Sequence, residues 1–229
     1  MKVSRPSDPR AGWTCAPPLK ENEPMIDLHT VATANGYKAS IMLEEVGLPY
    51  RVTAYDLLKG ENFKPELLAI NRVGRLPVIV DHGVEGESLA VYGSAAILQY
   101  LADKTGQLLP KEMRARAKVL EWMGIISSDI APAYSGQFVF NVVAQEKQPW
   151  AVAFYDRLCS RMAQTLEDQL ALTPFLAGDE YSIADILAYP VATVSMKRYP
   201  GNLDAHPNLA RWAATIGTRP AVQRGMSVP

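Results

Sequence analysis

Residues 76–101 read LPVIVDHGVEGESLAVYGSAAILQYL, and this stretch decides the fold. Two runs of aliphatic and β-branched residues, 76–80 and 87–91, predict two strands. The turn formers between them, Asp81, Gly83 and Gly86, predict a hairpin. Beyond the hairpin, four residues recur at the spacing of one helix face (Ser94, Ile97, Leu98, Leu101). The stretch therefore predicts a β-β-α unit.

Upstream of this unit, residues 25–75 alternate between strand and helix patterns. The runs 25–31 and 50–55 favour strands. Asn35 is a suitable N-cap for a helix between them, and Pro65 suits the first turn of a second, short helix. The full order is β-α-β-α-β-β-α. This order predicts a mixed four-stranded sheet with helices, a thioredoxin-like α/β domain over residues 25–106.

Downstream, every apolar repeat has helical spacing, so residues 107–229 are expected to form an all-α domain. Residues 1–24 contain five prolines and mixed charge, which favours an extended N-terminal arm. The order of elements thus predicts an arm and two domains of different class.

Composition excludes several classes of protein. The chain has 23 Lys plus Arg against 24 Asp plus Glu, a formal charge of −1, which argues against nucleic acid or membrane surfaces as partners. No run is long and apolar enough for a transmembrane helix, and the first residues do not form a secretory signal. Cys15 and Cys159 form neither a metal site nor a CxxC pair, so a cytoplasmic protein without metal is expected.

Three motifs carry a family resemblance. Residues 33–38 read Thr-Ala-Asn-Gly-Tyr-Lys, residues 71–77 read Asn-Arg-Val-Gly-Arg-Leu-Pro, and residues 182–185 read Ser-Ile-Ala-Asp. In this order, on these elements, they resemble the cytosolic glutathione transferases over about residues 25–225. The first motif is similar to that of the bacterial nu class, the group of glutathione-dependent disulfide-bond oxidoreductases. The third is also a helix capping box, so its Ser182 and Asp185 are interpreted as folding residues.

The resemblance implies that Thr33 and Asn35 are catalytic. They stand where the first strand meets the first helix, and the free N–H groups and dipole of a helix start favour an anion. A cysteine thiol has a pKa of about 8.5, so glutathione at neutral pH is mostly protonated. Hydrogen bonds to its sulfur from Thr33 and Asn35 would stabilise the thiolate. The structural alternative is that Asn35 is only a cap and Thr33 only a strand end.

The resemblance also implies a glutathione-binding set. It places Leu76 and a cis Pro77 beside the cysteinyl residue of glutathione and Ser94 at a carboxylate, and it adds Arg75 and Asn62. The family usually has an acidic residue or Gln before this serine, whereas here Gly93 precedes it. A lost hydrogen bond to the glutathione ammonium would cost ~1.5–3 kcal/mol. Either another acid substitutes, or glutathione binds weakly, or the ligand differs.

A second departure lies in the helical domain. Nu-like chains often have Arg-Tyr where this chain has Phe154-Tyr155, so an arginine contact to a second glutathione or a disulfide product is not expected. Tyr134, Phe138 and Phe140 are candidates for the wall of the substrate pocket, although core packing explains them equally well.

The expected function is therefore that of a homodimeric, glutathione-dependent thiol–disulfide oxidoreductase that acts on a small disulfide. Two alternatives remain. One is conjugation of glutathione to small electrophiles by the same thiolate. The other is a non-catalytic binding module on this fold, which Gly93 favours.

Overall fold

The computed structural model describes residues 25–198 and 205–229, so the predicted arm, with Cys15, lies outside the described residues. The sheet half contains four strands, β1 (Ile26–Thr30), β2 (Tyr50–Ala54), β3 (Val78–Asp81) and β4 (Leu89–Tyr92). They lie in the order β2-β1-β3-β4. Strand β1 is parallel to β2 and antiparallel to β3, which pairs antiparallel with β4. The predicted mixed four-stranded sheet is confirmed.

The register brings three chain segments to one edge of this sheet. His29 near the end of β1 pairs with Val78 at the start of β3, and Val78 pairs with Tyr92 at the end of β4. The loop after β1, the turn before β3 and the loop after β4 therefore meet at this edge, which is called the site edge below. Because β2 is parallel to β1, it also ends there.

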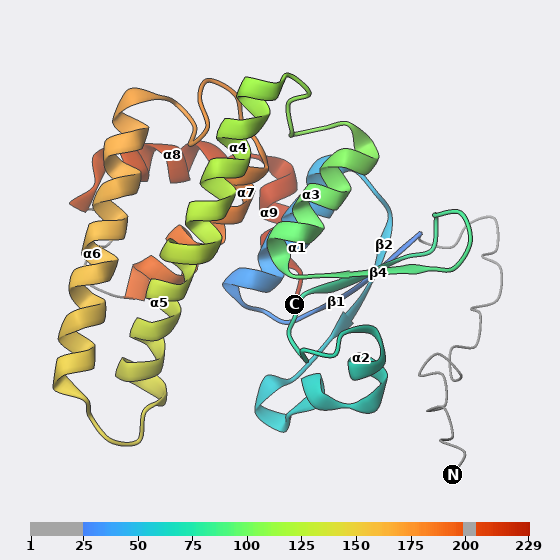
Figure 1. Cartoon of the computed structure of the whole chain (residues 1–229), viewed down its shortest axis with the longest axis horizontal. Coiled ribbons are helices and arrows are strands. Elements are labelled where there is room, and N and C mark those ends of the chain that lie inside the picture. The colour runs from blue at the N-terminus through green and yellow to red at the C-terminus, as the bar shows by residue number, and fades with distance from the viewer. Residues whose placement is uncertain (1–24, 199–204) are drawn as a thin grey trace, which may run out of the picture.

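Three α-helices belong to the sheet half: α1 (Ala34–Val46), α2 (Pro65–Ile70) and α3 (Ser94–Thr105). Helices α1 and α3 pack against each other, and α7 (Ile183–Pro190) of the helical half contacts both. Helix α2 lies apart from them, below the sheet in Figure 1, together with the 3-10 turns η1 (Leu57–Lys59) and η2 (Glu61–Phe63). Gly47 and Gly106 end α1 and α3 with left-handed backbone, a conformation that glycine adopts without strain.

Among the described residues beyond α3, the regular elements are helices, as predicted, apart from one isolated β-bridge between Phe175 and Gly178. A long antiparallel pair forms the left side of Figure 1. Its first member is α4 (Met113–Ile125), continued through the π turn η3 (Ile126–Ile130), α5 (Ala131–Phe138) and η4 (Val139–Val143); its second is α6 (Pro149–Leu172). The remaining helices are α7 (Ile183–Pro190) with η5 (Val191–Ser195) and η6 (Met196–Arg198), α8 (Pro207–Gly217) and α9 (Pro220–Ser227).

A proline explains the π turn η3. Pro132 follows η3 directly after Ala131, so the turn that its ring crowds lies within η3. Proline has no amide hydrogen and its ring crowds the preceding turn, so it interrupts the α pattern locally. A wider π turn accommodates the change without ending the helix.

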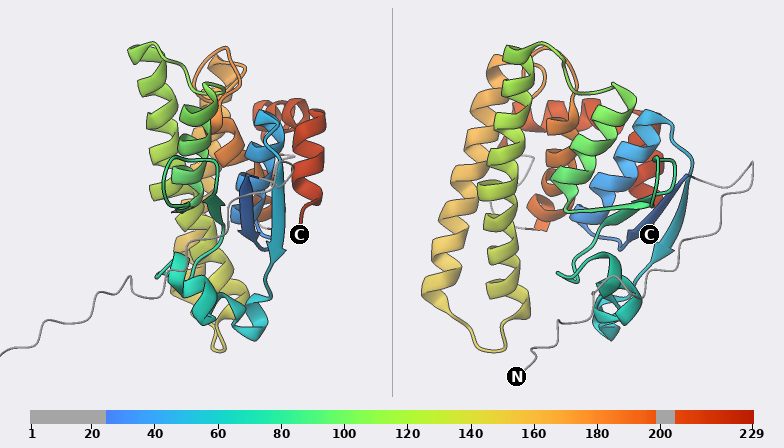
Figure 2. Two further views of the ribbon diagram at one scale, coloured as in Figure 1. Left: turned by 90° about the vertical axis from the view of Figure 1, so that its right-hand side faces the viewer. Right: turned by 45° about the vertical axis from the view of Figure 1, so that its right-hand side comes forward.

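Helix α9 returns to the sheet half and packs along α1, as both views in Figure 2 show. A Cβ atom at Gly225 would lie 2.5 Å from the Ile41 Cα, so only glycine permits this approach. The buried Ser40 hydroxyl donates to the Gly225 carbonyl at 2.7 Å. Arg219, just before α9, forms a bidentate ion pair with Glu45 at 2.7 and 2.8 Å. The two halves consequently share one continuous core.

Candidate functional site

The candidate site begins at the start of α1. Thr33 is the N-cap, and its hydroxyl oxygen accepts from the Gly36 N–H at 3.3 Å. The prediction that Asn35 caps this helix is wrong, because Thr33 has the extended backbone of a cap and Asn35 lies within the first turn. The N–H groups of Ala34 and Asn35 are helix-start donors that the helix itself cannot satisfy. Thr33 is half-buried and Asn35 is exposed, so a ligand can reach both.

Gly36 permits the close approach of the helix to the strand before it. A Cβ atom at this position would lie 2.0 Å from the Val31 carbonyl oxygen and 2.6 Å from the Thr30 hydroxyl. A larger residue would push the start of α1 away from the site edge. The motif therefore requires glycine at this position on steric grounds.

Lys38 is a residue of this motif that the sequence interpretation missed. Its side chain is only 2% exposed, and its ammonium donates to the Asn35 Oδ1 at 2.8 Å. Burial lowers the pKa of the Lys38 ammonium to about 8. The signal was present in the sequence, since residues three apart on a helix face each other.

The turn before β3 is held by two buried asparagines. The Leu76–Pro77 peptide bond is cis. Asn71 donates through its Nδ2 to the Arg75 carbonyl at 2.5 Å and accepts from the Val73 N–H at 3.0 Å. Asn62 donates through its Nδ2 to the Gly74 carbonyl at 2.8 Å, so this amide serves the turn. Leu76 is half-buried, Pro77 is buried and Arg75 is exposed.

The start of α3 is the third segment. Ser94 is its first residue and is half-buried. Gly93, in the N-cap position, has φ +85, and a Cβ atom added there would meet no other atom within 4 Å. It forms no side-chain cap, and it supplies no polar group for a ligand ammonium. There is room for a side chain at position 93, so this position lacks a polar group rather than space.

The helical half contributes buried residues of a different kind. Tyr134 is 2% exposed and donates to the Cys159 carbonyl at 3.1 Å, so its candidacy for the pocket wall is wrong and it belongs to the core. Phe138 is partly exposed, whereas Phe140 stacks on Tyr155. Burial raises the pKa of the Cys159 thiol to about 12, which makes it a poor nucleophile at neutral pH.

The start of α7 is a completed capping box. Asp185 accepts from the Ser182 N–H at 3.0 Å, and Ser182 accepts from the Ala184 N–H. The other Asp185 oxygen accepts from the Leu176 N–H at 3.0 Å and from the Trp212 Nε1–H at 2.9 Å. Burial raises the pKa of Asp185. All these groups are inside the protein, which supports a folding role.

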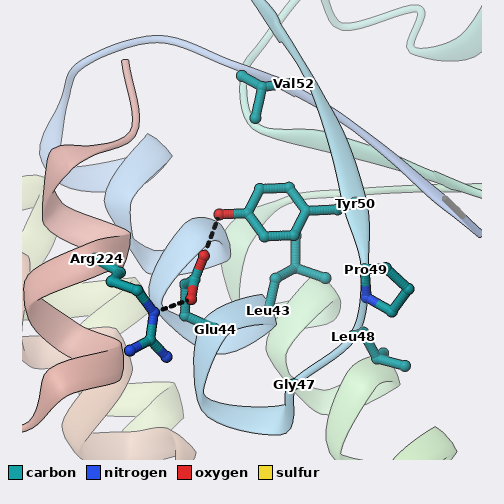
Figure 3. A pocket seen from close by; sticks show the side chains of 8 residues that line it. All are labelled: Leu43, Glu44, Gly47, Leu48, Pro49, Tyr50, Val52 and Arg224. Atoms are coloured by element: carbon teal, nitrogen blue, oxygen red, sulfur yellow. Dashed lines mark hydrogen bonds and ion pairs between the residues drawn. The ribbon is translucent and has the colours of Figure 1, made fainter.

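A surface groove of about 560 Å³ lies at the opposite end of α1 from Thr33 (Figure 3). Its polar centre is Glu44, which accepts from the Tyr50 hydroxyl at 2.8 Å and from the Arg224 Nε at 2.6 Å. These contacts join α1, β2 and α9, so the groove reflects how α9 is docked. It is separate from the site edge.

Within the described ranges 25–198 and 205–229, no group of three metal-binding side chains comes together. No helix of the described chain is long and apolar enough to cross a membrane. The site edge offers hydroxyl, amide and backbone donors around the start of α1.

Comparisons with known proteins agree with this geometry. Residues 34–104 match the description "Glutathione S-transferase, N-terminal domain" and residues 159–220 match "Glutathione S-transferase, C-terminal domain". The chain is 37% identical to the disulfide-bond oxidoreductase YfcG of Escherichia coli, over 88% of this chain and 94% of that protein. It is 31% identical to YghU, another disulfide-bond oxidoreductase of Escherichia coli, over 96% of this chain and 80% of that one.

Solved structures extend the likeness to three dimensions. A glutathione transferase of Pseudomonas putida, with one glutathione disulfide bound per subunit, superposes with a TM-score of 0.85 at 30% identity, covering 92% of this chain and 94% of that one. A family member from Pseudomonas fluorescens, with two glutathione molecules bound, gives a TM-score of 0.84 at 31% identity, covering 92% and 96%.

Proposed function

Because the chain belongs to the glutathione transferase family, we propose that it uses glutathione to reduce small disulfides, as a thiol–disulfide oxidoreductase of the nu-class type. The observation that carries the proposal is the open start of α1. There Thr33 and Asn35 offer hydroxyl, amide and backbone donors at the positive end of a helix. The names of the relatives YfcG and YghU support the same reaction class.

Glutathione is proposed to bind along the site edge. The backbone of Leu76, next to cis Pro77, pairs with its cysteinyl residue as an added antiparallel strand. The start of α3 at Ser94 receives one carboxylate, and Arg75, exposed in the turn before β3, adds a cation at the site edge. Asn62 supports this arrangement indirectly, because its amide holds Gly74.

The thiolate is then placed at Thr33 and Asn35, where hydrogen bonds favour its ionised form. It attacks one sulfur of a small disulfide, so a new S–S bond forms to glutathione and the other sulfur leaves as a thiolate that takes up a proton. A second glutathione thiolate attacks this mixed disulfide. The products are oxidised glutathione and two reduced thiols, and the two glutathione molecules supply both electrons. No protein cysteine is needed.

We also propose that the protein is a homodimer. Three large apolar side chains near α2 are exposed: Leu58 fully, Phe63 to 63% and Val73 to 59%. Exposed apolar patches of this kind mark interfaces. A Leu58→Asp variant is expected to lower the mass measured by light scattering towards that of a monomer. An unchanged mass would place the interface elsewhere.

The proposed reaction depends on a reduced glutathione pool, which the cytoplasm maintains, so we place the protein there. The substrate is proposed to be a small disulfide. The site edge offers only a few hydrogen-bond donors, grouped around the start of one helix, which suits a small substrate. Conjugation to an electrophile is the competing use of the same thiolate.

The test of the function is calorimetric titration with reduced and, separately, oxidised glutathione at neutral pH, followed by assays of disulfide reduction and of conjugation to chloro-dinitrobenzene. Sub-millimolar binding with faster disulfide reduction supports the proposal. Faster conjugation would assign the protein to the conjugating transferases. No heat and no thermal shift at millimolar ligand would make it a non-catalytic module.

A further inference from the structure

Lys38 is buried in an unusual environment. The side chain lies on α1, is 2% exposed, and has a hydrogen bond from its Nζ to the Asn35 Oδ1 at 2.8 Å. Burial is the cause of its lowered pKa, and no carboxylate contributes to that pKa among the described residues. A buried ammonium without a paired carboxylate is costly to fold. Its position next to the open helix start therefore requires a reason.

The chemistry of lysine fixes the orientation of Asn35. An ammonium has three donors and no acceptor, so the atom of the Asn35 amide that faces it must be the oxygen. The Nδ2 group then has to face the other way. Asn35 is exposed in the first turn of α1, so that NH2 group is free to meet a ligand at the helix start.

A free asparagine amide at this position would present oxygen or nitrogen with little preference. An amide oxygen turned towards a thiolate would repel it, whereas the NH2 group donates to it. A group that holds the oxygen therefore decides whether Asn35 helps or opposes ionisation.

We propose that Lys38 is a positioning residue, which holds the Asn35 Oδ1 so that the Asn35 Nδ2 donates to the thiolate of bound glutathione. This inference rests on the proposed function, since it concerns the same thiolate. It adds a residue that touches neither the sulfur nor the disulfide substrate and acts through Asn35.

The variant that tests it is Lys38→Met. Methionine is an unbranched apolar side chain of similar length, and it removes the cost of burying a charge that has no paired carboxylate. The exposed Asn35 oxygen can be hydrated instead. The melting temperature is therefore expected to stay the same or rise, which separates positioning from folding.

The readout is the pKa of the bound glutathione thiol, followed as thiolate ultraviolet absorbance against pH. In the unaltered protein this pKa is expected to lie below the free value of about 8.5. In Lys38→Met it is expected to rise by about one unit, which corresponds to ~1.4 kcal/mol. Asn35→Ala is expected to show a rise of similar size.

The double variant Asn35→Ala/Lys38→Met decides the mechanism. If Lys38 acts through Asn35, its removal adds no further shift once Asn35 is gone. Lys104→Met is the matched control, because Lys104 pairs with Asp81, which lies at the opposite edge of the sheet from Val78. It should leave the thiol pKa unchanged.

Two outcomes overturn the inference. An unchanged thiol pKa in Lys38→Met would show that Lys38 has no role in ionisation. Fully additive shifts in the double variant would show that the Lys38 charge acts on the thiolate directly and not through Asn35. Failure of the proposed function looks different. In that case the unaltered protein itself binds no glutathione, or binds it with an unshifted thiol pKa.

Discussion

Two helix starts in this molecule use similar residues for opposite purposes. At α7, Asp185 accepts from the Ser182 N–H and Ser182 accepts from the Ala184 N–H inside the core, and Asp185 also accepts from Trp212. At α1, Thr33 caps only the Gly36 N–H, and the next residue with a polar side chain, Asn35, is exposed. The first start is complete and closed to ligands. The second is incomplete and accessible.

Capping and anion binding are alternative uses of the same N–H donors at a helix start. A helix start whose N–H groups are all taken contributes to folding, whereas one with remaining donors can hold an anion. Changes at α7 should therefore alter stability, and changes at α1 should alter the thiolate.

The largest effect is expected from Asp185→Ala. It leaves the buried N–H groups of Leu176, Ser182 and Trp212 without an acceptor, and each unsatisfied group costs ~1–3 kcal/mol. We expect the free energy of unfolding, measured in urea, to fall by about 3 kcal/mol or more. Ser182→Ala is the control and should cost only ~0.5–2 kcal/mol. A loss below about 1 kcal/mol for Asp185→Ala would contradict the conclusion that the start of α7 contributes to folding.

Thr33→Val tests the open start. Valine keeps the shape of threonine but cannot donate to sulfur, and a hydrogen bond to a charged group contributes ~1.5–3 kcal/mol. Disulfide reduction at neutral pH should therefore fall roughly tenfold to a hundredfold. The lost cap should cost stability only ~1 kcal/mol. Thr33→Ser retains the hydroxyl and should keep most of the activity; equal losses in both variants would point to packing instead.

Gly93→Gln tests the third segment of the site edge. It places a polar side chain in open space at the start of α3, and calorimetry should show up to about tenfold tighter glutathione binding. The left-handed backbone at φ +85 should reduce stability by ~1 kcal/mol or more. Gly93→Ala carries the same strain without the polar group. Tighter binding in that control would show that the backbone, rather than the amide, is responsible.

The smallest effect is expected from removing both cysteines. Cys159 is fully buried, and the proposed reaction uses only glutathione sulfur. The variant Cys15→Ser/Cys159→Ala should retain disulfide reduction within about twofold, checked by initial rates alongside a melting curve. Loss of activity in a folded double variant would contradict the cysteine-free mechanism.

The sheet was predictable from local patterns. Strand runs, the turn formers between β3 and β4, and Pro65 at the start of α2 all act within a few residues, so the order of elements followed from them. The cap of α1 was assigned wrongly to Asn35 because Thr33 and Asn35 are both capable caps two residues apart. The spacing of apolar residues does not show which of two nearby polar residues is the N-cap.

The parts that were missed depend on tertiary packing. Lys38 is charged, and a lysine is ordinarily expected at the surface, so its burial was not predicted. Tyr134 lies on a helix whose stripe fits both core and pocket, and only the packing of α6 assigns it to the core. The return of α9 to α1 joins residues such as Ser40 and Gly225, which no local pattern connects.

The docking of α9 on α1 also has a consequence for the order in which contacts form during protein synthesis. Helix α1 ends at Val46, but the face of α1 that contacts Gly225 stays uncovered until α9 has been synthesised. Until then, α1 lacks the contact of Ile41 with Gly225, and Glu44 and Glu45 lack their arginine partners. Because α9 follows the other helices in the chain, α1 gains these contacts only after those helices have been synthesised.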